Sequence, residues 1–344
     1  MSPQFVDFDA DGLLDIVAGI YDGSPHLVRG TDKGWGKPEQ ILDREGSRIA
    51  LNTWWHHDKL RWEKTTRYDA PGVSGPEGHM TSAIAFDVDG DADLDLLLGD
   101  YKSGRIFRRI NEGTAREPKF GLVNEPVLAG GVPIDVPGNV ATMRLVDWDK
   151  DGLMDLACGS MGVVEGERAE GEGGGIFLFL NTGTKTAPSY AAPITLVPRT
   201  SARSEEPKRP DVGLYMDFGD HDGDGDLDII AGGYSIVTPK QPVLTAEQQK
   251  RVGELQAGLA DLAKATTELS RSIQDAAKGL DEAAARKKRA EAYESKKEDY
   301  SKLNKQRQEL TKELEPLVPP TRRVSYVWLY ENLGASAKAP ADPR

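Results

Sequence analysis

Four short aspartate-rich segments share one pattern, and this repetition constrains the fold more than any other feature of the sequence. Each segment places aspartates at positions 1, 3, 5 and 9 of a nine-residue loop, then continues into a short apolar run that ends near a glycine. The four loops are DFDADGLLD (7–15), DVDGDADLD (87–95), DWDKDGLMD (147–155) and DHDGDGDLD (220–228). Four copies in register predict a repeat protein in which each repeat folds around one such loop.

The spacing suits a hard cation. Alternate aspartates in a tight loop can turn toward one centre, and Ca²⁺ takes about six to eight oxygen ligands in a flexible geometry. Glycine at position 6 permits a positive-φ turn, so Ala92, which fills that position in the second loop, predicts a more strained or differently shaped turn there. A main-chain carbonyl at position 7 can then also coordinate the ion, while the position 9 aspartate closes the shell. The alternative is a set of Asp/Gly surface turns that bind no metal.

The segments after the loops also repeat. The apolar runs at 14–19, 94–99, 154–159 and 227–232 are short and glycine-bounded, which is typical of buried strands. A second strand follows at 104–114, 174–184 and 324–334, and each copy closes with an Asn and a Gly. Two copies continue to a proline and an aromatic residue, Phe120 or Tyr190. The predicted unit is strand, cation loop, strand, tight turn and strand, with a connecting segment that can supply a fourth strand.

The loops, together with the N-x-G-T-x-x-x-P-x-(F/Y) tail, resemble FG-GAP or VCBS-type repeats, the calcium-loop blades of integrin-α-like β-propellers. The resemblance covers most of the chain outside residues 240–320. It implies an all-β fold, a β-propeller with four recognisable calcium-loop blades that form part of a larger propeller, and about one Ca²⁺ per repeat. The implied metal ligands are Asp7, Asp9, Asp11 and Asp15; Asp87, Asp89, Asp91 and Asp95; Asp147, Asp149, Asp151 and Asp155; and Asp220, Asp222, Asp224 and Asp228. The resemblance leaves Asp93 and Asp226 out of this set, because they fall at position 7, where the family usually offers a backbone carbonyl.

The first repeat begins almost at the start of the sequence. No strand precedes Phe5 and Val6 that could complete a first blade. We therefore expect the first blade to lack a strand unless the C-terminal segment supplies it, and we expect the chain to be cut from something longer.

Residues 241–320 break the pattern and predict helices. Apolar or small residues fall alternately three and four apart between Val252 and Leu280, which is a heptad seam. Thr245 and Gln248 can form a capping box, and Gly279–Asp281 is the expected bend. We predict an antiparallel coiled-coil hairpin inserted in the fourth blade. The predicted organisation is blades at 1–240, the hairpin at 241–320, a returning strand at 321–334 and a flexible tail at 335–344.

Functional residues outside the loops are few. Residues 51–80 contain five candidate ligand-binding residues, Trp54, Trp55, His56, His57 and Trp62. The tryptophans could stack on sugar rings, and the histidines could act as acid and base. The alternative is an aromatic plug with a packing role. No catalytic residue is assigned. The sequence favours a non-catalytic calcium-binding propeller that acts as an extracellular binding or scaffold module for protein or carbohydrate partners. The second interpretation is a secreted polysaccharide lyase or hydrolase that uses residues 51–80.

Charge and hydropathy limit the classes of partner that the chain can bind and bear on the compartment in which it is expected. The chain has 56 acidic and 43 basic residues, a net charge of −13, which gives it no reason to attract nucleic acid or anionic membranes. No apolar run is long enough to span a membrane, and Cys158 is expected in the core. No signal segment is present, but loops of this type are commonly weak calcium binders, so we expect an extracellular or periplasmic protein whose signal was removed or truncated. The helical hairpin could serve self-association or a partner, or be a solvated insertion without a role.

Overall fold

The computed structural model describes residues 3–69, 78–162, 172–201 and 203–334. It divides into two compact units, one formed by Val237–Arg322 and the other by the rest of the chain. The tail expected to be flexible, 335–344, and residues 70–77 of the Trp/His segment lie outside the described residues.

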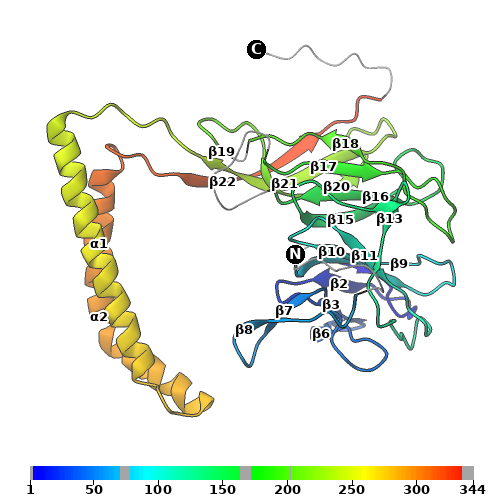
Figure 1. Cartoon of the computed structure of the whole chain (residues 1–344), viewed down its shortest axis with the longest axis horizontal. Coiled ribbons are helices and arrows are strands. Elements are labelled where there is room, and N and C mark those ends of the chain that lie inside the picture. Colours follow the sequence, from blue (N-terminus) through cyan, green and yellow to red (C-terminus); the bar gives the residue numbers. More distant parts are fainter. Residues whose placement is uncertain (1–2, 70–77, 163–171, 202, 335–344) are drawn as a thin grey trace. The chain divides into compact units, whose positions relative to one another are not determined.

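The larger unit contains four antiparallel sheets, one for each aspartate loop (Figure 1). Sheet 1 consists of β1 (Gln4–Val6), β2 (Asp15–Gly19), β3 (Pro25–Val28) and β6 (Glu39–Gln40). Sheet 2 consists of β9 (Met80–Phe86), β10 (Asp95–Asp100), β11 (Ile106–Arg109) and β12 (Glu125–Pro126). Sheet 3 consists of β15 (Val140–Val146), β16 (Asp155–Ser160), β17 (Ile176–Phe179) and β18 (Ile194–Val197). Sheet 4 consists of β20 (Val212–Gly219), β21 (Asp228–Val237), β19 (Arg203–Ser204) and β22 (Arg322–Tyr330), with β19 and β22 paired to β21.

Three short hairpins lie between these strands. They are β4 (Gly30–Thr31) with β5 (Gly34–Trp35), β7 (Thr53–His56) with β8 (Arg61–Lys64), and β13 (Leu128–Ala129) with β14 (Val132–Pro133). In every sheet the aspartate loop joins two paired strands, β1 to β2, β9 to β10, β15 to β16 and β20 to β21, and its position 9 aspartate begins the second strand of the pair. In sheet 4 the short β19 precedes this pair in the sequence. The expectation that the first blade lacks a strand is wrong. Sheet 1 takes all four strands from residues 4–40, because the short β6 pairs with β3.

Consecutive sheets pack face to face on three apolar cores. Alternate residues of one strand point to opposite faces of its sheet, so in β10 Leu96 and Leu98 contact the core shared with sheet 1, whereas Leu97 contacts the core shared with sheet 3. Cys158, as expected, is fully buried, in the core between sheets 2 and 3. We call the face that a sheet turns toward the next sheet in sequence its following face, and the opposite one its preceding face.

The glycine that ends each apolar run marks the closest approach between neighbouring sheets. A Cβ atom placed on Gly19 would lie 2.8 Å from the backbone nitrogen of Ala83, in the first strand of sheet 2. On Gly99 it would lie 2.6 Å from the Val140 side chain in sheet 3, and on Gly159 it would lie 2.0 Å from the Leu214 carbonyl oxygen in sheet 4. These glycines therefore let the first strand of the next sheet pack directly against the second strand of the one before.

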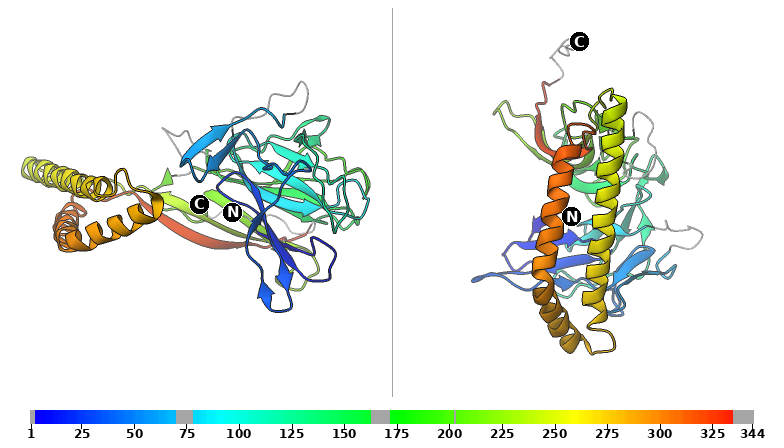
Figure 2. Two further views of the ribbon diagram at one scale, coloured as in Figure 1. Left: turned by 90° about the horizontal axis from the view of Figure 1, so that it is seen from below. Right: turned by 90° about the vertical axis from the view of Figure 1, so that its left-hand side faces the viewer.

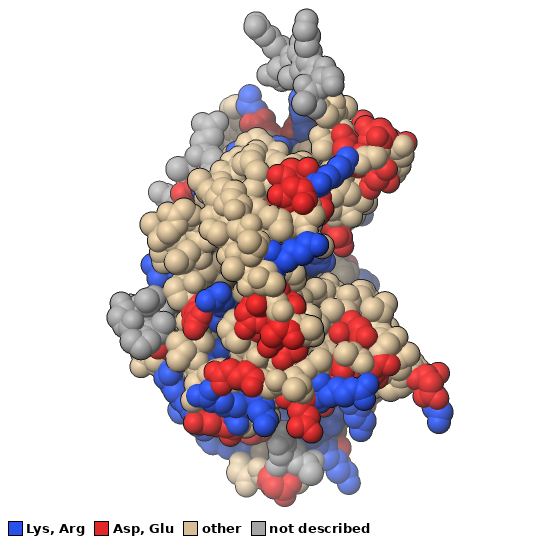
Figure 3. Space-filling model, turned by 90° about the vertical axis from the view of Figure 1, so that its right-hand side faces the viewer, with Lys and Arg blue, Asp and Glu red and all other residues tan. Residues whose placement is uncertain are grey.

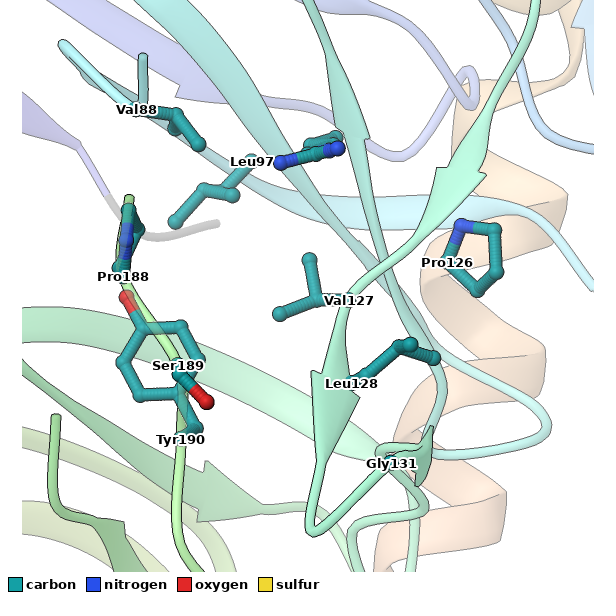
Figure 4. A pocket seen from close by; sticks show the side chains of 10 residues that line it. Val88, Leu97, Pro126, Val127, Leu128, Gly131, Pro188, Ser189 and Tyr190 are labelled. Atoms are coloured by element: carbon teal, nitrogen blue, oxygen red, sulfur yellow. The ribbon is translucent and has the colours of Figure 1, made fainter. Parts of the chain in front are cut away.

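The aromatic residue of the tail motif completes the same junctions. The residue at position 2 of a loop points back into the core, where Phe8 contacts the fully buried Phe120 of the next repeat with ring centroids 6.3 Å apart. Between sheets 2 and 3, Val88 and Tyr190 occupy the equivalent places and line a cavity of about 310 Å³ (Figure 4). The tail motif thus locks one repeat onto its predecessor.

The smaller unit is a pair of long helices. Helix α1 (Ala246–Asp275) begins at the expected capping box, in which Thr245 and Gln248 exchange hydrogen bonds, and α2 (Glu282–Leu314) begins at Asp281. The helices lie side by side (Figure 2) and run antiparallel, because Arg251 near the start of α1 pairs with Glu313 near the end of α2, and Ser270 pairs with Tyr300 closer to the turn. The turn passes through Gly279 at φ +80°. In the described part of the chain, neither helix is apolar enough over a bilayer-spanning length to cross a membrane.

Candidate metal centres and aromatic pocket

Each aspartate loop is shaped by hydrogen bonds to its own carboxylates. The position 1 side chain spans the loop. In loop 1 the Asp7 oxygens accept from the N–H groups of Asp11 and Gly12, both at 3.0 Å. The position 5 side chain accepts from the N–H two residues ahead in all four loops, for instance Asp151 from Leu153 at 2.8 Å. These hydrogen bonds hold the loop backbone in place and use some of the carboxylate oxygens.

Two positions in every loop take positive φ. Position 6 has φ +91° at Gly12, +84° at Gly152 and +91° at Gly225. Ala92 adopts φ +75° at the same position, which is a strained conformation for a residue other than glycine. Of the two alternatives predicted for this turn, strain is confirmed, and a different backbone shape at this position is wrong. Position 4 is also left-handed, at Ala10, Gly90, Lys150 and Gly223. These paired turns reverse the backbone twice within nine residues and bring alternate side chains together.

The structure brings three predicted ligands together in each loop. One carboxylate oxygen from each member of a set can lie within 4.8 Å of the others. The sets are Asp7, Asp9 and Asp15; Asp87, Asp89 and Asp95; Asp147, Asp149 and Asp151; and Asp220, Asp222 and Asp228. The remaining predicted ligands, Asp11, Asp91, Asp155 and Asp224, belong to the same loops but fall outside these sets. Three converging carboxylates form an oxygen-rich site of the kind that Ca²⁺ selects.

A second feature of the loops fits a cation. In each loop one buried carboxylate oxygen has no hydrogen-bond partner among the described residues, namely Oδ1 of Asp9, Asp93, Asp147 and Asp226. A buried carboxylate oxygen without a hydrogen-bond partner is costly, and a bound cation would supply the missing interaction. Two of the four, Asp93 and Asp226, occupy position 7, where a backbone carbonyl alone was expected to bind. The sequence signal was available, because only loops 2 and 4 carry an aspartate there.

Burial and mutual repulsion raise several of these pKa values. Burial, reinforced by Asp91 and Asp89, raises the pKa of Asp93 to about 6. Burial also raises the pKa of Asp95 to about 6 and raises that of Asp155 above its usual value. Hydrogen bonds from the N–H groups of Asn332 and His221 instead hold the pKa of Asp228 below its usual value. Gathering the carboxylates in loops 2 and 3 therefore opposes their ionisation, a cost that a divalent cation would offset.

In loop 1 a basic side chain bonds directly to one of the three converging carboxylates. The Arg29 guanidinium bonds to Asp9, a member of the converging set, and also to Glu39 at 3.0 Å. This internal cation would compete with a metal for the Asp9 carboxylate. On the face shown in Figure 3, acidic side chains form several separate groups interspersed with basic ones, rather than one continuous acidic surface.

The Trp/His segment forms an aromatic cluster beside sheet 1. The β7–β8 hairpin pairs Trp55 with Trp62, whose rings are 5.7 Å apart, and Trp62 lies 4.6 Å from His79. His79 also contacts Tyr21 and Tyr101, each at 5.3 Å. Burial lowers the pKa of His79, and its buried Nε2 atom has no hydrogen-bond partner among the described residues.

An open pocket of about 560 Å³ lies at this cluster. It is lined by Ile20, Tyr21, Asp22, Trp55, His57 and Trp62. Asp22 is buried at its base, 3.6 Å from His57 Nε2 and 3.2 Å from the Arg48 guanidinium. Tyr21, at 65% exposure, presents its ring to solvent.

Three of the five residues predicted to bind a ligand line this pocket, namely Trp55, His57 and Trp62. Trp54 and His56 do not line it, since neighbouring residues of a strand point to opposite faces. Sequence inspection missed Tyr21 and Asp22, which come from the turn after β2, because nothing in the sequence shows that this turn meets the β7–β8 hairpin.

The comparison with protein families agrees with the repeat. Residues 87–158, which span loops 2 and 3 and the strands between them, match the family of FG-GAP-like repeats. Residues 87–158 therefore contain an FG-GAP-like repeat, and the described residues form mostly β-sheets with two helices. No curated protein matches it.

Proposed function

We propose that this chain is a calcium-binding β-propeller module that binds protein or carbohydrate partners outside the cell or in the periplasm. The observation that carries the calcium assignment is the convergence of three carboxylates in each of the four loops. The unpartnered buried oxygen in every loop supports it independently. Four similar sheets stacked through repeated junctions support a propeller arrangement. Extracellular calcium modules work at dissociation constants of about 0.1–1 mM, which favours a compartment rich in calcium.

Calorimetric titration of the purified chain with CaCl₂ tests the metal assignment. We expect four binding events per chain, with MgCl₂ competing poorly because Mg²⁺ demands stricter octahedral geometry. The paired change Asp147→Asn and Asp149→Asn should remove one event and leave three, since both residues belong to the loop 3 set. At a calcium concentration about 100 times the dissociation constant, each site would stabilise the fold by about 2.7 kcal/mol. Absence of calcium binding, or an unchanged stoichiometry in the loop 3 variant, would refute the assignment.

We assign partner binding to the aromatic pocket. Exposed aromatic faces beside a buried carboxylate suit a sugar ring, which stacks through its C–H groups and donates hydroxyl hydrogen bonds to an acceptor such as Asp22. A glycan array read with the wild type, Trp62→Ala and Trp54→Ala tests this role. Binding should be lost in Trp62→Ala and kept in Trp54→Ala, because Trp54 belongs to the same hairpin but does not line the pocket. Equal binding by all three proteins would contradict the assignment.

The enzymatic alternative rests on one contact. His57 Nε2 lies 3.6 Å from the buried Asp22 carboxylate in the same pocket, an arrangement that could move a proton. Incubation with a polysaccharide panel, followed by detection of new reducing ends or unsaturated products, separates the two functions. Turnover by the wild type that is absent in His57→Gln would favour a polysaccharide lyase or hydrolase, and binding without turnover would favour the module.

A further inference from the structure

Two sheet faces in the described part of the sheet unit are exposed to solvent, whereas the faces between consecutive sheets are buried. Position 11 of each repeat lies on the following face. It is fully buried at Val17 and Ala157, and Leu97 is 1% exposed, but Ile230 of sheet 4 is 42% exposed. Five residues before the closing asparagine, Ile106 and Ile176 are 1% and 0% exposed, whereas Val327 is 78% exposed. The following face of sheet 4 therefore has the apolar residues of an inter-sheet junction without a partner.

Gly232, the glycine at the end of the apolar run in sheet 4, leaves space for a further sheet to pack against this face. Gly232 occupies the position of Gly19, Gly99 and Gly159, each of which has atoms of the next sheet within 3.0 Å of a notional Cβ. The nearest atom to a Cβ on Gly232 is the Tyr215 carbonyl oxygen of its own sheet, at 3.8 Å. The space beside Gly232, into which a strand of a following sheet could pack, is therefore open.

The preceding face of sheet 1 carries apolar residues at the positions that are buried in the internal junctions, and here these residues are exposed. Phe5, two residues before its loop, is 59% exposed, whereas the equivalent Ala85 is 2% exposed against sheet 1. Leu14 is 58% exposed, and Ile16 is only half-buried where the equivalent Leu96 is fully buried. In all three internal junctions a following face meets a preceding face. The described residues leave one face of each kind uncovered.

We propose that these two faces pair between two copies of the chain. The following face of sheet 4 in one copy packs on the preceding face of sheet 1 in the other, and the reverse pairing closes the assembly. A head-to-tail contact of this kind gives a closed ring when the rotation closes. Two chains with four described sheets each supply eight, within the range of about four to eight blades that propellers use. Within the described residues of the sheet unit, Phe5, Ile230 and Val327 remain exposed.

The mass of the full-length chain in solution tests this pairing. Sedimentation equilibrium of the wild type should give a dimer. The variant Ile230→Asp/Val327→Asp and the variant Phe5→Asp/Leu14→Asp should each sediment as monomers, because each removes one half of both junctions. Val132→Asp is the matched control, an apolar side chain 64% exposed in the β13–β14 hairpin and outside both faces, and it should remain dimeric. Circular dichroism confirms that each variant is folded.

A smaller change adds a second test. Gly232→Ala should keep the melting curve of the separated chain but weaken the dimer at least tenfold in dissociation constant, since the added Cβ fills the space beside this residue. The proposal is overturned if the wild type is monomeric, or if either double variant remains a dimer. Retention by the Phe5/Leu14 variant would show that two sheet 4 faces pair with each other, and retention by both would place the contact elsewhere, such as on the helices. These outcomes do not depend on calcium binding, so the proposed function and this inference fail separately.

Discussion

Asp95 Oδ1 accepts a hydrogen bond from the backbone N–H of Asn111 at 2.7 Å, while its Oδ2 accepts from the N–H of Val88 at 2.8 Å. One buried carboxylate thus ties the aspartate loop to the end of the third strand of its sheet. The same pair of bonds recurs in every repeat. Asp15 accepts from the N–H groups of Phe8 and Gly30, Asp155 from those of Trp148 and Asn181, and Asp228 from those of His221 and Asn332. The position 9 aspartate is therefore a structural clamp of the sheet as well as a candidate ligand.

The clamp predicts that Asp155→Asn destabilises the protein even without metal. An amide has one acceptor oxygen, so the N–H of either Trp148 or Asn181 would lose its partner in a site where Asp155 is fully buried. Leaving a buried donor unsatisfied costs about 1–3 kcal/mol. Urea unfolding in the presence of a chelator measures this loss directly.

Asp151→Asn is the matched control. Asp151 is exposed, and an asparagine oxygen can still accept the bond from the Leu153 N–H, so metal-free stability should change by less than about 0.5 kcal/mol. Equal losses in the two variants would show that position 9 acts only as a metal ligand.

Part of the fold and of the candidate sites could be predicted from the sequence, and part could not. Local patterns identified the four loops, the strands around them and the Thr245 capping box, because each depends on residues close together in the chain. The double role of Asp155 escaped prediction, since its partner Asn181 lies 26 residues away. The contribution of Tyr21 and Asp22 to the aromatic pocket escaped prediction for the same reason, since Tyr21 and Trp62 meet only after sheet 1 and the β7–β8 hairpin have formed. The fourth strand of sheet 1 was missed because β6 is two residues long.

A pair of reciprocal substitutions at position 6 isolates backbone strain. Ala92 at φ +75° carries a conformational cost of about 1–2 kcal/mol. Glycine removes that cost but adds about 0.5–1 kcal/mol of unfolded-state entropy. Ala92→Gly should therefore stabilise the protein by up to about 1.5 kcal/mol in thermal or urea unfolding.

Gly152→Ala tests the same physics in the opposite direction. Gly152 lies at φ +84°, and a Cβ there would meet no atom within 4 Å, so any loss reflects backbone conformation and not a clash. We expect a destabilisation of about 1 kcal/mol. If both substitutions shift stability in the same direction, the positive φ at position 6 is not the controlling feature.

The contact between neighbouring sheets predicts a larger effect at Gly159. A Cβ on this residue would lie 2.0 Å from the Leu214 carbonyl oxygen, which is fixed in β20 and cannot move without opening the junction between sheets 3 and 4. Gly159→Ala should lower the free energy of unfolding by about 1–3 kcal/mol or more.

Gly219→Ala provides the comparison for that change. Gly219 is also a strand glycine of the same unit, and a Cβ there would meet no atom within 4 Å. Its stability should be unchanged or slightly higher, because alanine loses less backbone entropy on folding than glycine. A loss at Gly159 no greater than that at Gly219 would mean that the sheets can separate at little cost.

Protonation of His79 should loosen the aromatic cluster. Burial lowers the pKa of His79 below its usual value of 6.5, so the folded protein resists a proton that the unfolded chain accepts. The contribution of the neutral ring is complete above pH 6.5 and is lost as the pH falls from 6.5 through the lower folded pKa. Because the His79 ring lies 4.6 Å from Trp62, the loss should appear as a change in tryptophan fluorescence and a lower melting temperature over that window. His79→Phe keeps a ring in the cluster and cannot titrate, so its fluorescence and melting should be flatter below pH 6.5. The same pH dependence in wild type and variant would exclude His79 as the group responsible.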